Sequence, residues 1–137
     1  MRISITEFKS FIDQEKGGLT FFEGLNDIPF EIKRVYYIYN VPAGENRGYH
    51  AHKHLKQMLF CPFGKINIVL DDGEMKEEIL LNEPSKGLII HEGIWRHMDF
   101  LEENSVLCVV ASEYYDECDY IRDYGEFIGL AKGGYWK

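Results

Sequence analysis

The chain has 137 residues, which is enough for one domain with a hydrophobic core and too few for two ordinary domains. Its formal net charge of −8 gives no general attraction to nucleic acids or anionic membranes, so any anionic ligand must be met by a few local cations. No apolar run approaches the ~20 residues of a membrane span, and the N-terminus lacks a signal-peptide pattern, so we predict a cytoplasmic protein without nucleic-acid or membrane partners.

The first predicted element is a short helical turn at TEFKSFID, residues 6–13. Thr6 is a suitable N-cap, and Glu7 would place an acidic side chain in the first turn. After it, turn signals alternate with short segments rich in β-branched and aromatic residues, such as RVYYIYNV, KINIVLDD, KGLIIHEG and SVLCVVAS. Many short strands at this spacing are typical of an antiparallel sandwich or barrel.

The clearest hairpin is KINIVL-DDG-EMKEEILL, where Asp72-Gly73 supplies a turn that allows positive φ. The tail DYIRDYGEFIGLAKGG places apolar residues at helical spacing from Tyr120 onward and ends at Gly133-Gly134, which predicts a C-terminal helix. No repeat or linker marks a second domain, so we expect one domain over residues 1–137. The three cysteines have no CxxC spacing and make an odd number, which suggests neither a disulfide framework nor a zinc knuckle.

The stretch RGYHAHKHLKQ, residues 47–57, carries the strongest functional signal. On a strand, His50, His52 and His54 face the same way, about 6.6 to 7 Å apart along the backbone. A solvated polar face is the alternative, and it is the better interpretation of a lone histidine. An alternating set behind Arg47, inside an all-β chain, favours a site instead. We expect His54 to lie at the rim, in solvent.

This stretch resembles the first motif of the cupin family, with Gly44, His50, His52, Gln57 and Gly64 at the motif's spacing. Gln57 stands where that family has its metal-binding glutamate. The resemblance implies a cupin jelly-roll, an antiparallel β-barrel or sandwich.

The second cupin motif is matched by KGLIIHEGIWRHM, and its Gly93 aligns the fourth ligand position with Arg96. A guanidinium has five donors and no lone pair, so it repels a metal ion. His97 is the nearest substitute, but a shift of one residue turns a strand side chain to the opposite face. With two of four ligands replaced, we predict no metal and no other cofactor.

Among metal-free cupins, the chain resembles the dTDP-4-keto-6-deoxy-D-glucose 3,4-ketoisomerases over nearly its whole length. The matching segments are IPFEIKRVYYIYNV, RGYHAHKHLKQ, INIVLDDG, WRHM and ASEYYDECDYIRDYGEF. The resemblance implies a homodimer that moves a keto group from C4 to C3 of the hexose, in 3-amino-3,6-dideoxyhexose synthesis. It also implies that His50 and His52 are the catalytic pair. Imidazole accepts and donates protons near neutral pH, and we assign His50 to carbon and His52 to oxygen.

The diphosphate of such a substrate requires cations. Arg47 resembles the phosphate-binding arginine that related epimerases carry just before their catalytic histidine. Arg34 in KRVYY and Arg122 in YIRDY are further candidates, because a planar guanidinium pairs with phosphate oxygens in a bidentate manner. For Arg34 and Arg122, a structural ion pair is an equal alternative in this acid-rich chain.

Three further positions belong to the predicted substrate-binding set. Tyr36 shares strand parity with Arg34, so it would face the ligand and Tyr37 would not. Gln57 is included because of its position in the first cupin motif. Arg96 stands where some members of the resembled family carry histidine, and it favours the gluco over the galacto product.

Other functions stay open at this stage. A dTDP-sugar 3,5-epimerase also needs a histidine base with an arginine behind it, and a cupin that binds a nucleotide sugar without turnover is a second alternative. A metal-dependent oxygenase is disfavoured by Gln57 and Arg96.

Overall fold

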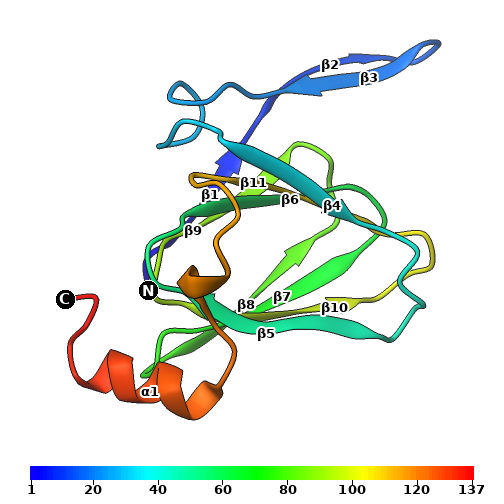
Figure 1. Cartoon of the computed structure of the whole chain (residues 1–137). Helices are drawn as coiled ribbons and strands as arrows, with labels where there is room; N and C mark the ends of the chain where they lie inside the picture. Colours follow the sequence, from blue (N-terminus) through cyan, green and yellow to red (C-terminus); the bar gives the residue numbers. More distant parts are fainter.

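The computed structural model describes residues 1–137 and contains twelve β-strands (Figure 1). In spatial order, the first antiparallel sheet contains β1 (Ile3–Glu7), β9 (Lys86–Ile90), β6 (Gln57–Phe63), β11 (Val106–Ala111) and β4 (Arg34–Ile38). The second contains β12 (Tyr120–Ile121), β5 (Asn46–His52), β10 (Trp95–Phe100), β7 (Ile66–Asp71) and β8 (Lys76–Leu81). The two sheets face each other as a cupin jelly-roll, which confirms the predicted fold.

The main core lies between the two sheets and contains alternate residues of their strands. Leu59 and Val109 come from the first sheet, and Ile68, Leu70 and Phe100 come from the second; none is more than 1% exposed. Burying such a side chain stabilises the fold by about 1.5–3 kcal/mol, so this core holds the sheets together.

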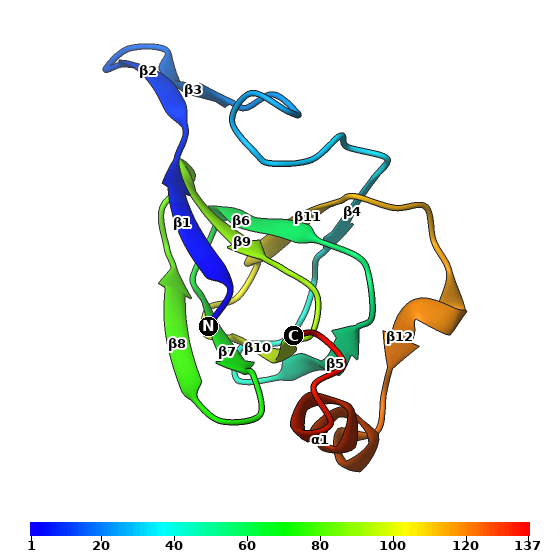
Figure 2. The same cartoon turned by 90° about the vertical axis from the view of Figure 1, so that its left-hand side faces the viewer.

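The outer face of each sheet is covered in part by its own small apolar cluster. Phe8, Ile28 and Phe30 pack on the first sheet. Helix α1 (Tyr124–Lys132) lies on the second sheet, where Phe127 packs near Trp95 (Figure 2). Trp95 is therefore a core residue under the helix.

The predicted hairpin is confirmed, because β7 pairs with β8 from Ile66↔Leu81 to Asp71↔Lys76. Gly73 has φ of 99° in the turn, as the Asp-Gly signal indicates.

One helix prediction is wrong. Residues 6–13 are not a helical turn: they end β1 and form β2 (Lys9–Asp13). The helical spacing of Phe8, Phe11 and Ile12 is misleading, because Phe8 is buried whereas Phe11 and Ile12 are exposed.

The C-terminal helix is confirmed, but it begins later than its apolar spacing predicts. Tyr120 and Ile121 form β12, which pairs with β5, and a 3-10 helix η1 (Glu117–Asp119) precedes it. Asp123 caps α1 by accepting a hydrogen bond from the amide of Glu126, which sets the helix start.

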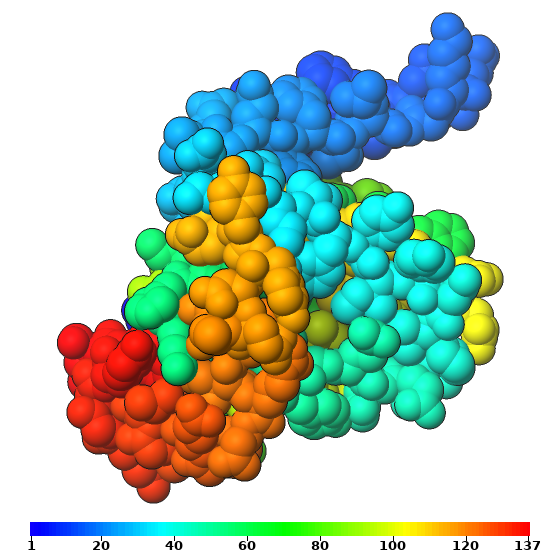
Figure 3. All heavy atoms as spheres, in the orientation of Figure 1, coloured from blue at the N-terminus to red at the C-terminus, as the bar shows by residue number.

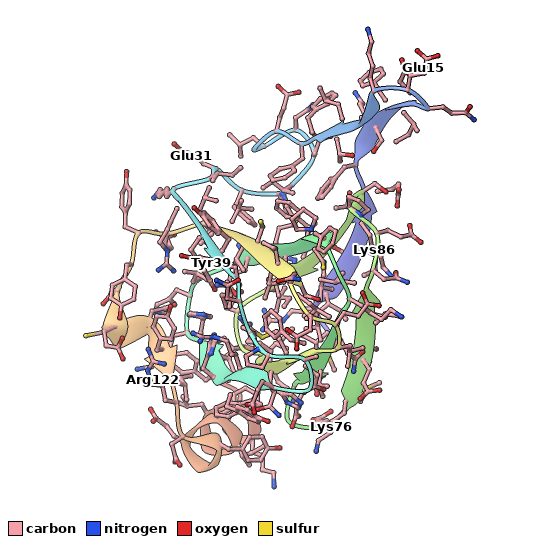
Figure 4. All side chains as sticks on the ribbon, turned by 90° about the vertical axis from the view of Figure 1, so that its right-hand side faces the viewer. Glu15, Glu31, Tyr39, Lys76, Lys86 and Arg122 are labelled. Atoms are coloured by element: carbon pink, nitrogen blue, oxygen red, sulfur yellow. The ribbon has the colours of Figure 1, made fainter.

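The hairpin of β2 and β3 (Gly17–Phe21) projects from the barrel and pairs with no other strand (Figures 1 and 3). Glu15 marks its tip in Figure 4. None of the helices in the structure has the length and apolar character that crossing a lipid bilayer requires.

Candidate active site

A cavity of about 250 Å³ lies between the edge strand β4 of the first sheet and strands β5, β10 and β12 of the second. It appears in Figure 3 as the hollow between the residues of β4 and the segment around η1 and β12. Its lining contains three arginines, two tyrosines and one histidine, and no acidic residue: Arg34, Tyr36, Ile38, Arg47, Gly48, His50, Met98, Tyr120 and Arg122. In a chain of net charge −8, this local excess of positive charge indicates an anion-binding site.

A β-bulge in β5 brings Arg47 and His50 to the same cavity. Residues three apart on a regular strand point to opposite faces. Here Arg96 of β10 pairs with His50 and the next residue, His97, pairs with Gly48, so Tyr49 is the extra residue of the bulge.

Gly48 is required at this bulge. Its φ is 106°, and a Cβ on it would lie 3.0 Å from the carbonyl oxygen of Arg96. Tyr49 also has positive φ, 60°, and its ring stacks on His97 at 4.8 Å.

The two predicted catalytic histidines occupy different depths. His50 lines the cavity, whereas His52 is completely buried behind it, with its ring 5.0 Å from that of His50 and 4.5 Å from that of Tyr120. Burial lowers the pKa of His50 to about 3, and the charge of Arg96 adds to this effect. Burial also lowers the pKa of His52 to about 4, although a hydrogen bond with Asp119 opposes the shift. Both rings are therefore neutral at pH 7.

Asp119 was not predicted from the sequence and is the partner of His52. Its Oδ2 lies 3.2 Å from Nδ1 of the histidine. It comes from the acid-rich run EYYDECDY, in which nothing distinguishes it from the neighbouring carboxylates, and only the pairing of β12 with β5 brings it to this position. Tyr120, another residue of the lining, was missed for the same reason.

A buried chain of hydrogen bonds links Arg96, Gln57 and Tyr36. The Nη1 of Arg96 donates to Oε1 of Gln57 at 2.6 Å, and Nε2 of Gln57 donates to the hydroxyl of Tyr36 at 3.1 Å. Because that hydroxyl accepts here, its own proton is left for a ligand in the cavity. Burial raises the pKa of Tyr36, so it stays protonated. Gln57 and Arg96 lie behind the lining and do not form part of it.

The arginines of the lining differ in their partners. Arg34 and Arg47 form no ion pair, and two nitrogens of Arg34, Nε and Nη2, are buried without a hydrogen-bond partner. Arg122, labelled in Figure 4, pairs with Glu117 through bonds of 2.9 and 3.1 Å. Of Arg34 and Arg122, for which a structural ion pair is the alternative to phosphate binding, only Arg122 forms such a pair. Arg122 also lines the cavity.

The remaining predictions about side-chain direction agree with the structure. Tyr37 is 62% exposed and points away from the cavity, and His54 is exposed beyond the end of β5. No group of three or more His, Cys, Asp or Glu side chains is placed to hold a metal ion, and the metal-free activity stays a prediction.

A second hollow of about 210 Å³ lies between the chain termini, the turn at Asp72–Glu74 and α1. Arg2 faces it but is held by Glu92 at 3.1 Å, and the hollow contains no histidine. We therefore take the cavity at His50 as the candidate active site.

Comparison with known proteins identifies relatives along the full chain. A curated TDP-4-oxo-6-deoxy-alpha-D-glucose-3,4-oxoisomerase from Aneurinibacillus thermoaerophilus is 44% identical over 140 residues, covering 98% of this chain and 100% of the relative.

Two solved structures show the same similarity in three dimensions. A variant of the 3,4-ketoisomerase QdtA from Thermoanaerobacterium thermosaccharolyticum, in complex with TDP-4-keto-6-deoxyglucose, has a TM-score of 0.93 at 46% identity, covering 98% of this chain and 97% of that one. The TDP-quinovose 3,4-ketoisomerase WlaRB from Campylobacter jejuni has a TM-score of 0.87 at 41% identity, covering 93% and 98%. The family model described as FdtA: WxcM-like, C-terminal matches residues 1–132, and the chain belongs to this family of sugar-nucleotide 3,4-ketoisomerases.

Proposed function

We propose that the protein moves the keto group of dTDP-4-keto-6-deoxy-D-glucose from C4 to C3. The observation that carries this proposal is the neutral imidazole of His50 on the wall of a cavity that holds three arginines and no acid. A proton-transfer group beside an anion-binding surface is the arrangement that isomerisation of a nucleotide sugar needs. Membership in the family supports the same substrate and reaction.

His50 is assigned to the carbon atoms. It removes the hydrogen on C3 as a proton, the C–H electron pair forms a C3=C4 double bond, and the former carbonyl electrons move to O4. His52 accepts the proton of the O3 hydroxyl and delivers it to O4. The O3 electrons then form the new carbonyl at C3, and C4 takes a proton from the imidazolium of His50, which exchanges with solvent before this step. Atoms and charge balance, so the reaction requires no oxidant or reductant.

Arg34, Arg47 and Arg122 are assigned to the diphosphate. Phosphate oxygens would supply partners for the buried nitrogens of Arg34, which have none in the protein. The free hydroxyl proton of Tyr36 is available to a sugar or thymine oxygen. Gln57 and Arg96 complete the substrate-binding set from behind by holding Tyr36 in place.

We assign the gluco epimer as the product. The reason is Arg96. The ketoisomerases that this chain resembles carry either arginine or histidine at this position, and arginine favours the gluco product. The similarity to an enzyme named for quinovose, which is 6-deoxyglucose, supports this choice. Identification of a galacto product by coupling constants would contradict it.

A homodimer of single cupin domains, each formed by residues 1–137, is the proposed assembly. The projecting hairpin supports it, because Phe11, Ile12 and Leu19 are 66%, 77% and 59% exposed there. Light scattering that gives the mass of a monomer at micromolar concentration would contradict the dimer.

The experiment that tests the function follows the carbonyl carbon. The purified protein is incubated with dTDP-4-keto-6-deoxyglucose labelled with ¹³C in the sugar ring, in the presence of a chelator. We expect the keto signal to move from C4 to C3. A 3,5-epimerase would leave the keto group at C4, and a binding module would leave all carbons unchanged.

A further inference from the structure

We propose that Asp119 is a positioning residue for the isomerisation: it holds the ring proton of His52 on Nδ1 and leaves Nε2 as the acceptor. The proposal rests on the function proposed above, since His52 matters only if protons move at this site. It goes further by assigning a tautomer to His52, one of two histidines that look equivalent in the HAH motif.

The carboxylate of Asp119 is held on several sides, so its direction is fixed. Its Oδ1 accepts the amide of His54 at 2.8 Å, and its Oδ2 accepts the amide of Leu55 at 3.3 Å. The backbone carbonyl of Asp119 accepts the amide of Lys53 at 3.0 Å. The chain that leaves β5 is thereby tied to η1, and the remaining lone pairs of Oδ2 face the ring of His52.

The hydrogen-bond partners of Asp119 determine which tautomer of His52 is present. Burial opposes ionisation of Asp119, but the bonds from His52 and from the amides of His54 and Leu55 outweigh it and lower its pKa. An ionised carboxylate has acceptors only, so Nδ1 of His52 must donate. A neutral imidazole carries one N–H, and Nε2 therefore holds the lone pair.

In this arrangement, Nε2 of His52 is free to accept a proton. It is buried and has no hydrogen-bond partner in the protein, which is costly for a polar atom. The rings that pack against the His52 ring, those of His50 and Tyr120, both line the cavity. In the proposed reaction, Nε2 accepts the O3 proton and releases it to O4, so the histidine ends the cycle in the tautomer in which it began.

The test compares Asp119→Asn with the parent protein by two readouts. In the variant, the amide oxygen keeps the short bond from His54 and the amide N–H faces His52, so the ring proton must move to Nε2. Long-range ¹⁵N–¹H NMR of the ligand-free protein should show Nδ1–H in the parent and Nε2–H in the variant. We expect kcat to fall about 10²- to 10⁴-fold, while KM and the Kd for dTDP change less than about threefold.

The matched control is Asp116→Asn, which alters a carboxylate at the start of the same 3-10 helix that accepts only the amide of Cys118. It should leave both readouts unchanged. Asp119→Glu, which keeps the charge, should retain the Nδ1–H tautomer and more activity than the Asn variant.

Two results would overturn the proposal. One is an Nε2–H tautomer of His52 in the parent protein, which is decisive even if Asp119→Asn does not fold. The other is a folded Asp119→Asn variant whose kcat stays within about threefold of the parent. Failure of the proposed function is a different result: the parent protein would form no 3-keto sugar, and the tautomer would still be measurable.

Discussion

The cavity wall and the layer directly behind it contain similar residue types but have different partners. On the wall, Arg34, Arg47 and His50 line the cavity, and neither arginine forms an ion pair. Behind it, Gln57 and Arg96 are at most 2% exposed and are bonded to each other. The difference indicates that the wall residues contact the ligand, whereas Gln57 and Arg96 hold a wall residue, Tyr36, in position.

The largest effect should come from His50→Asn on the wall. Asparagine fills a similar space and cannot take a proton from carbon, so kcat should fall about 10²- to 10⁴-fold. The Kd for dTDP, measured by calorimetry, should not change, because the nucleotide is assigned to the arginines. Retained turnover would remove His50 from the mechanism.

A second wall variant, Arg47→Ala, should weaken binding rather than chemistry. Hydrogen bonds to charged groups contribute about 1.5–3 kcal/mol, so the Kd for dTDP should rise roughly 10- to 100-fold. The control is Arg2→Ala, whose parent side chain pairs with Glu92 away from the cavity. Equal affinity in the two variants would contradict the assignment of Arg47 to phosphate.

In the second layer, Gln57→Leu should affect stability more than affinity. The variant leaves Nη1 of Arg96 buried without its acceptor, which should lower the free energy of unfolding by about 1–3 kcal/mol. Urea denaturation measures the change, and Arg47→Ala serves as the comparison because an exposed wall residue should cost less than about 0.5 kcal/mol. If the two variants are equally stable, the wall and the second layer do not differ in the way we describe.

A fourth expected effect is a dependence of stability on pH. The folded pKa values of His50 and His52 are about 3 and about 4, below the ordinary histidine value, so the unfolded chain binds more protons between about pH 4 and 6.5. Their contribution to stability is present above pH 6.5 and is lost as pH falls, by at most about 1.4 kcal/mol per unit for each ring. His52→Gln should flatten the profile, and an unchanged slope would contradict the buried neutral ring.

Sequence reasoning predicted the wall better than the second layer. Arg34, Tyr36 and His50 follow from parity along single strands, which a sequence displays directly. That Arg47 joins them depends on the bulge at Gly48-Tyr49, whose only sign in the sequence is a glycine.

Asp119 could not be found from the sequence because its role depends on pairing across 67 residues. The helical turn predicted at residues 6–13 failed for a related reason. The pairing of β1 with β9, and of β2 with β3, overrides the local apolar spacing of that segment.

The most direct test of the account is the pattern of deuterium uptake by the sugar ring in D₂O. The protein is incubated with dTDP-4-keto-6-deoxyglucose, and the ring positions are followed by NMR for the parent and for His50→Asn. We predict exchange at C3 and C4 and none at C5 in the parent, and no exchange in the variant. Exchange at C5, or exchange at C3 that persists without His50, would contradict the proposed isomerisation with His50 as its base.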